Sequence, residues 1–131
     1  MKKYNNYLIS NLWSNVKSGN INTLKTYLEN GGNPNIHIKD EYLIDICINN
    51  IEMLKLLKEY NVIVPIRIFI FLIFQRYHKK IDLLYDNIID INEKHHDLTP
   101  LIITAYMCNG VSKERNYMIN LLYKLIDDDA N

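Results

Sequence analysis

The fold of this chain is decided by residues 12–35, which read LWSNVKSGNINTLKTYLENGGNPN. Two short helical patterns lie in this stretch, because apolar residues recur three or four positions apart on either side of Gly19. Gly19 itself is suited to a tight turn with positive φ, and Gly31-Gly32 is suited to ending the second helix. The stretch therefore predicts two helices joined by a tight turn and followed by a loop.

The same order of helix, turn and helix returns three times, at residues 43–57, 66–85 and 99–122. Loops rich in Asn and Asp follow the pairs, as in the segments 31–35 and 90–92. The spacing of the last unit leaves room for an insertion at Val111–Asn116. A single helix pair cannot bury its apolar face, so we expect successive pairs to stack on one another.

These repeated residues resemble the ankyrin repeat. The pattern Leu-x-x-x-Val-x-x-Gly-Asn, followed by Leu-x-x-Tyr-Leu-Glu-Asn-Gly-Gly-Asn-Pro-Asn, is similar to that family's unit, and Thr99-Pro100-Leu101 matches its helix start. The resemblance covers nearly the whole chain. It implies an all-α fold, a solenoid of stacked antiparallel helix pairs with short loop or hairpin connections. It also implies one domain, 1–131, with approximate repeats 5–36, 37–64, 65–93 and 94–131.

Two other structures fit part of the pattern. A plain helical bundle would explain the helical periodicity, but it would not explain why Asn- and Asp-rich loops recur after every second helix. Alternatively, residues 63–74 could form a buried strand, because the segment is rich in β-branched and aromatic residues.

The composition bears on partners and location. The chain has 131 residues, with 15 Lys and Arg against 15 Asp and Glu, so we expect neither a nucleic acid nor a membrane as partner. The longest apolar stretch, residues 62–74, is shorter than the ~20 residues of a membrane-spanning helix. Cys47 and Cys108 lie in apolar segments and no signal peptide follows Met1, which predicts buried free thiols and a cytoplasmic protein, in its organism or in a host.

No pattern in the sequence predicts catalysis. The four histidines, His37, His78, His95 and His96, lack Cys or carboxylate neighbours at metal-ligand spacing. Phosphate-binding glycine loops, nucleophile motifs and calcium loops are missing as well. We therefore expect no catalytic residues, no metal, no cofactor and no enzymatic activity.

The resemblance instead implies that a concave surface, made of loop tips and first helices, binds another protein. In each unit we assign to it the two residues after the position of the family's alanine pair, together with the loop tips. The predicted contact residues are Lys17, Ser18, Lys39, Asp40, Glu41, Ile48, Asn49, Phe74, Gln75, Glu93, His95, His96, Leu98, Tyr106 and Met107. The apolar members would form a ridge inside a polar rim, as in binding hot spots, whereas Trp13 is expected in the core.

The sequence thus predicts a monomeric, non-catalytic protein–protein interaction module. Two narrower versions of this function stay open. One is a bacterial immunity protein that neutralises a cognate toxin, and the other is a viral factor that interacts with host proteins.

Overall fold

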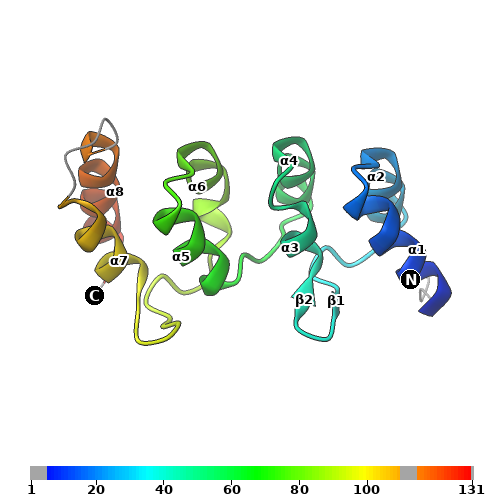
Figure 1. The fold of residues 1–131 in the computed structure, drawn as a ribbon, viewed down its shortest axis with the longest axis horizontal. Coiled ribbons are helices and arrows are strands. Elements are labelled where there is room, and N and C mark those ends of the chain that lie inside the picture. Colours follow the sequence, from blue (N-terminus) through cyan, green and yellow to red (C-terminus); the bar gives the residue numbers. More distant parts are fainter. Residues whose placement is uncertain (1–5, 110–114, 131) are drawn as a thin grey trace. The chain divides into compact units, whose positions relative to one another are not determined.

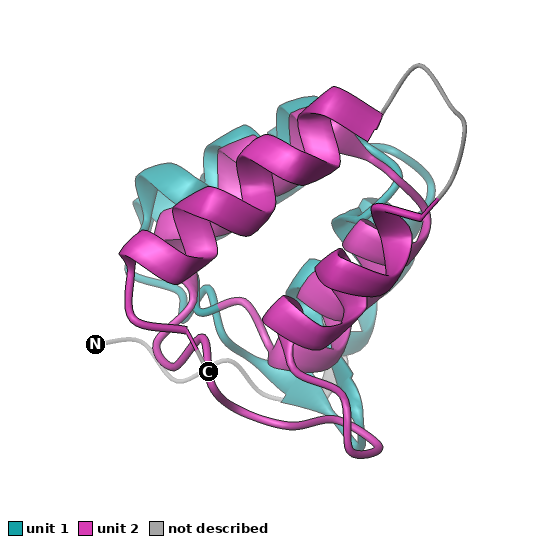
Figure 2. Cartoon of the chain, turned by 90° about the vertical axis from the view of Figure 1, so that its left-hand side faces the viewer, with its two compact units in different colours: residues 1–63 teal, residues 64–131 magenta. Residues whose placement is uncertain are grey.

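The computed structural model describes residues 6–109 and 115–130 of the chain. This part contains eight α-helices, one short 3-10 helix and one two-stranded hairpin, so the predicted all-α character is confirmed. The chain divides into two compact units, Met1–Ile63 and Val64–Asn131, which Figure 2 shows in teal and magenta. In the described residues, no helix has the length and apolar content needed to cross a membrane.

Unit 1 consists of two helix pairs joined by a β-hairpin (Figure 1). Its elements are α1 (Asn6–Lys17), α2 (Ile21–Glu29), β1 (His37–Ile38), β2 (Glu41–Tyr42), α3 (Leu43–Cys47) and α4 (Ile51–Glu59). Helix α1 packs against α2 and α3, and α4 packs against α3 and α2. Within this unit, the first helices of the two pairs (α1 and α3) therefore pack on each other, and the second helices (α2 and α4) do so as well.

Asparagine caps stabilise the turns inside these two pairs. The side-chain oxygen of Asn20 accepts a hydrogen bond from the Thr23 N–H at 3.2 Å, and that of Asn50 accepts one from the Met53 N–H at 3.1 Å. Gly19, directly before the first cap, has a φ of +92°, a conformation that glycine adopts at little cost. The predicted turn at Gly19 is confirmed.

The loop that leaves α2 needs glycine for a steric reason. The Gly32 N–H donates to the Tyr27 carbonyl at 2.9 Å, and this places the backbone at position 32 under the buried Tyr27 ring. A β-carbon at position 32 would lie only 2.5 Å from that ring. The Tyr27 hydroxyl in turn donates to the Asn33 carbonyl at 2.8 Å, so the ring fixes the path of the loop.

Unit 2 repeats this arrangement with other residues. Its elements are α5 (Ile66–Phe74), α6 (His78–Leu84), the 3-10 helix η1 (Tyr85–Asn87), α7 (Pro100–Met107) and α8 (Arg115–Asp127). Helix α5 packs against α6 and α7, and α7 packs against α8. The alternative of a strand at 63–74 is wrong, because residues 66–74 are helical. Six of these nine residues are buried, and burial on several sides of a helix removes the one-sided pattern that would have identified it.

The entry to α7 follows the sequence closely. The Thr99 hydroxyl accepts a hydrogen bond from the Ile102 N–H at 3.2 Å, and Pro100 occupies the first turn, where its missing N–H costs nothing. Before this helix, His95 and Leu98 exchange two backbone hydrogen bonds of 2.9 and 3.0 Å. Both residues between them have positive φ, which makes a two-residue hairpin of the type I′ kind.

Two tyrosines tie the second helices of unit 2 together. The Tyr117 hydroxyl donates to Asp82 Oδ1 at 2.7 Å, which joins α8 to α6, and the Tyr85 hydroxyl donates to Asp128 Oδ2 at 2.7 Å. Burial and these carboxylates raise the pKa of both phenols, so both remain protonated donors at neutral pH.

Some predictions concern the ends of these elements. Helix α1 begins at Asn6, more than one turn before Leu12, where the apolar pattern starts. The predicted insertion at Val111–Asn116 falls largely on residues 110–114, which lie outside the described part of the chain. Its last two residues open helix α8.

Candidate functional site

The register of the first helices decides which side chains face outward. In each first helix, buried residues follow one another with spacings of one and three positions. These triads are Leu12, Trp13 and Val16; Leu43, Ile44 and Cys47; Phe69, Ile70 and Ile73; and Ile103, Thr104 and Met107. The predicted pairs 17–18, 48–49 and 74–75 stand at equivalent positions after the first three triads. All six of these residues are exposed except Ile48, which is half-buried.

In the fourth unit, the predicted pair is two residues too early. Met107 is only 6% exposed, because it is the last member of the buried triad, so its assignment to the contact surface is wrong. The equivalent pair is Cys108 and Asn109, which are half-buried and exposed. Tyr106 is 67% exposed, but it stands at the position of the buried Leu72 on α5 and not at the predicted outward pair, so it is kept as a candidate for its exposure alone. Trp13 is buried, as predicted.

In unit 1, a surface hollow brings four of the predicted residues together between α1 and the hairpin. They are Lys17, Lys39, Asp40 and Glu41, and the remaining lining residues are Trp13, Ile38 and Asp45. The other predicted residues of this unit, Ser18, Ile48 and Asn49, do not line the hollow.

Glu41 is the centre of this hollow. Its Oε1 accepts a hydrogen bond from the Trp13 indole N–H at 2.7 Å and lies 3.2 Å from Lys17 Nζ. These two contacts, the indole bond first, hold the pKa of Glu41 below its usual value. The carboxylate therefore stays charged, and it fixes the hairpin, with Lys39 and Asp40 at its tip, against α1.

In unit 2, the exposed side chains of the two first helices are apolar. Phe71 and Phe74 on α5 and Ile102 and Tyr106 on α7 are each more than two-fifths exposed, although the two helices pack together. Gln75, which follows Phe74, is exposed as well. Phe71 and Ile102 were missed by the sequence analysis. Their helical spacing from Phe74 and Tyr106 was the available signal.

The hairpin of unit 2 presents the remaining predicted residues. Glu93 and His96 are exposed, whereas His95 and Leu98 are half-buried. The rings of His95 and His96 lie edge to face, with centroids 4.2 Å apart. Across residues 6–109 and 115–130, no group of three or more His, Cys, Asp or Glu side chains is placed to hold a metal ion.

The two thiols offer little nucleophilic character. Cys47 is fully buried, and burial raises its pKa to about 12. Burial also raises the pKa of the half-buried Cys108, although Arg115 opposes this effect. Both thiols are therefore protonated at neutral pH, and a protonated thiol is a poor nucleophile.

Comparison of the chain with models of protein families, with curated proteins and with solved structures found no match. Its function is therefore inferred from two surfaces, each within one unit. They are the charged hollow of unit 1 and the exposed apolar side chains of α5 and α7 in unit 2, which are Phe71, Phe74, Ile102 and Tyr106.

Proposed function

We propose that this chain is an ankyrin-type repeat protein that binds another protein and carries out no chemistry. One observation supports this proposal most strongly. Both units have the same order of elements, a helix pair, a hairpin and a second helix pair, and in both units the first helices pack on each other. This is the order expected from the ankyrin resemblance of residues 12–35.

The side chains outside the core fit binding better than catalysis. Exposed aromatic and aliphatic side chains such as Phe74 and Tyr106 are the anchors that interfaces use, and charged groups such as Lys39 and Asp40 are typical of a polar rim. In the proposal, the exposed apolar side chains of α5 and α7 supply affinity and the charged hollow of unit 1 supplies specificity.

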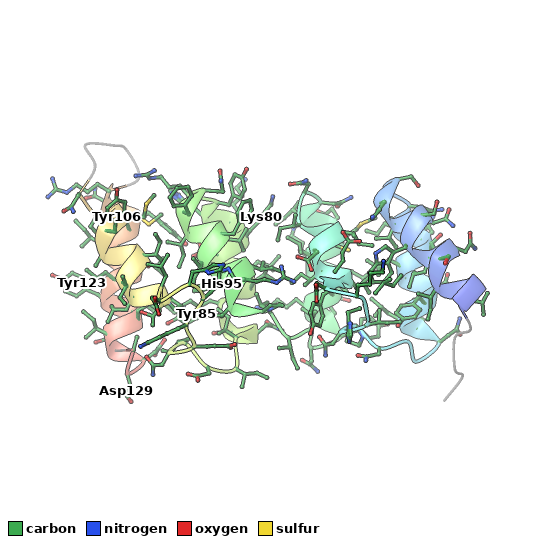
Figure 3. All side chains as sticks on the ribbon, turned by 60° about the horizontal axis from the view of Figure 1, so that its bottom comes forward. Lys80, Tyr85, His95, Tyr106, Tyr123 and Asp129 are labelled. Carbon is green, nitrogen blue, oxygen red and sulfur yellow. The ribbon has the colours of Figure 1, made fainter. Side chains whose placement is uncertain are left out.

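Two exposed tyrosines of unit 2 allow a matched test. Tyr106 lies on the first helix α7 and is 67% exposed, whereas Tyr123 lies on the second helix α8 and is 63% exposed (Figure 3). The immobilised full chain is used to capture proteins from a lysate of its source organism or host, and captured proteins are identified by mass spectrometry. The purified candidate is then titrated against wild-type, Tyr106→Ala and Tyr123→Ala chains by calorimetry.

The proposal expects a saturable partner whose affinity falls at least about tenfold with Tyr106→Ala, as for an interface anchor, and changes little with Tyr123→Ala. Circular dichroism of all three chains should be the same. Equal effects of the two substitutions, or no saturable partner, would contradict the assigned surface.

A further inference from the structure

Most of the described charged residues of unit 2 lie toward one end or the other of its helices. Four cations gather at the end where α5 turns into α6 and α8 begins: Arg76, Lys79, Lys80 and Arg115, called here the basic end. Seven carboxylates and two lysines, Lys94 and Lys124, lie toward the other end, where α6 and α8 finish. The carboxylates are Asp86, Asp90, Glu93, Asp97, Asp127, Asp128 and Asp129. Figure 3 labels Lys80 and Tyr106 toward one end of unit 2 and Tyr85 and Asp129 toward the other.

Contacts between α6 and α8 hold the basic end together. The rings of His78 and Tyr117 stack with centroids 3.9 Å apart, and the Tyr117 hydroxyl lies 3.3 Å from the His78 carbonyl oxygen. Arg115, at the start of α8, lies near Cys108 at the end of α7, where its charge lowers the pKa of that thiol. On the other side, Arg76 lines a small pocket with Tyr106, Met107 and Asn109.

One described carboxylate, Asp82, lies on the same helix as Lys79 and Lys80, where it accepts a hydrogen bond from Tyr117. None of the four cations has an ion-pair partner among residues 6–109 and 115–130. Lys80 Nζ lies 4.5 Å from the Tyr77 ring centroid, and partial burial lowers the pKa of this lysine. The Arg76 Nε is buried without a hydrogen-bond acceptor. The Tyr77 ring stabilises the Lys80 charge, whereas the partial burial of Lys80 and the unbonded Arg76 Nε make the positive charge of the free protein less favourable, and a nearby anion would offset these two effects.

The first turn of α8 places a cation unfavourably. Arg115 stands in this turn, which holds no acidic residue, whereas the helix dipole favours anions there. The last turn holds both Lys124 and Asp127, so the charges of that turn largely offset each other. An anion bound beside Arg115 would offset the unfavourable first turn.

We propose that the basic end of unit 2 binds a short acidic segment of another protein. Several Asp or Glu side chains would face the four cations, and an apolar side chain would enter the pocket beside Arg76. A long polyanion such as nucleic acid fits less well, because the seven carboxylates at the opposite end of the same unit repel it. The proposal goes beyond the proposed function, because the four cations lie at the helix turns and take no part in it, although the pocket beside Arg76 shares Tyr106 with the exposed apolar side chains of α7.

Lys79 and Lys94 provide the matched test. Both are exposed, and Lys79→Glu and Lys94→Glu change the net charge by the same amount, but Lys94 lies outside the basic end. The probe is a fluorescent 12-residue peptide of alternating Glu and Gly with one central Leu, titrated with the full chain at low ionic strength. Anisotropy should show saturable binding that Lys79→Glu weakens about tenfold, that Lys94→Glu changes less than twofold, and that added salt weakens.

Three results would overturn the proposal. The first is no binding of the Glu peptide by a chain whose circular dichroism shows it folded. The second is equal weakening by Lys79→Glu and Lys94→Glu, which would indicate a response to net charge alone. The third is tighter binding of a 12-nucleotide single-stranded DNA that is lost with Lys79→Glu, which would assign the basic end to nucleic acid.

Discussion

The substitution Gly32→Ala adds one methyl group to unit 1 and should destabilise it strongly. The new β-carbon would lie 2.5 Å from Cε1 and Cζ of Tyr27 and 2.6 Å from Cε2. Non-bonded carbons rest about 3.5–4.0 Å apart, so the ring must move by about 1 Å. The ring is 4% exposed and its hydroxyl is bonded to the Asn33 carbonyl, so a displacement of the ring disturbs its packing and breaks this bond.

Two costs add up in this substitution. Overpacking of a well-packed site costs about 1–3 kcal/mol, and loss of the Tyr27–Asn33 hydrogen bond costs about 0.5–1.5 kcal/mol. We expect the free energy of unfolding to fall by about 3 kcal/mol. With a urea slope of about 1–3 kcal/mol per molar, the unfolding midpoint should fall by roughly 1–3 M. Trp13 is the only tryptophan and lies buried in unit 1, so its fluorescence reports this unit.

A double-mutant cycle separates the clash from other effects. In a Tyr27→Leu chain the ring is gone, so adding Gly32→Ala should cost less than about 1 kcal/mol. Gly31→Ala serves as a second control, because its β-carbon would meet no atom within 4 Å. Its φ of +86° still predicts a cost of about 1 kcal/mol from the left-handed backbone. If Gly32→Ala costs the same with and without the Tyr27 ring, the steric explanation is wrong.

Three further predictions use single residues. Thr99→Ala should lower the free energy of unfolding, measured by thermal melts, by about 1 kcal/mol, because α7 loses its N-terminal cap. Thr99→Ser keeps a hydroxyl and should retain most of this stability. Equal melting temperatures for wild type and both variants would show that the cap does not stabilise α7. The pKa of Glu41 is lowered in the folded protein, so its contacts with Trp13 and Lys17 stabilise the fold fully at pH values above the usual pKa of about 4.5. This stabilisation is lost as the pH falls through the lower pKa of the folded state. Acid titration of Trp13 fluorescence should show this step, and its persistence in Glu41→Gln would assign it to another group. In urea unfolding, Met107→Ala should lower the free energy of unfolding by about 2–5 kcal/mol, because Met107 is buried. Tyr106→Ala should lower it by less than about 0.5 kcal/mol, because Tyr106 is exposed. The reverse order would show that the burial of these two residues is misassigned.

Local signals in the sequence predicted the turns and caps well. Gly19, Thr99 and Pro100 each act through backbone geometry within three or four residues, so their roles can be deduced from the residues alone. The third helix pair was predicted to begin at residue 66, and α5 does begin at Ile66. The strand alternative arose because the apolar residues of this segment lie on several sides of the helix, so the sequence shows no one-sided helical pattern.

Long-range contacts could not be deduced in this way. The bond between Trp13 and Glu41 spans 28 positions, and no local pattern pairs an indole with that particular carboxylate. Met107 was misassigned because the alanine-pair position was placed at Thr104-Ala105. The buried triad that ends at Met107 shows that the equivalent pair is Tyr106-Met107. A shift of two residues turns a helix by more than half a circle, and this moved a core side chain onto the predicted surface.

The two candidate surfaces differ in how far they are organised before binding. In unit 1, Glu41 is held by Trp13 and Lys17, so a partner that meets Lys39 and Asp40 finds the hairpin already in place and little conformational entropy is lost. In unit 2, Phe74 and Tyr106 are mostly exposed, so their burial would contribute hydrophobic free energy. A partner that used both surfaces would gain specificity from fixed charges and affinity from aromatic rings. Neutralising Lys39 should therefore change the association rate and its salt dependence, whereas truncating Tyr106 should change the dissociation rate.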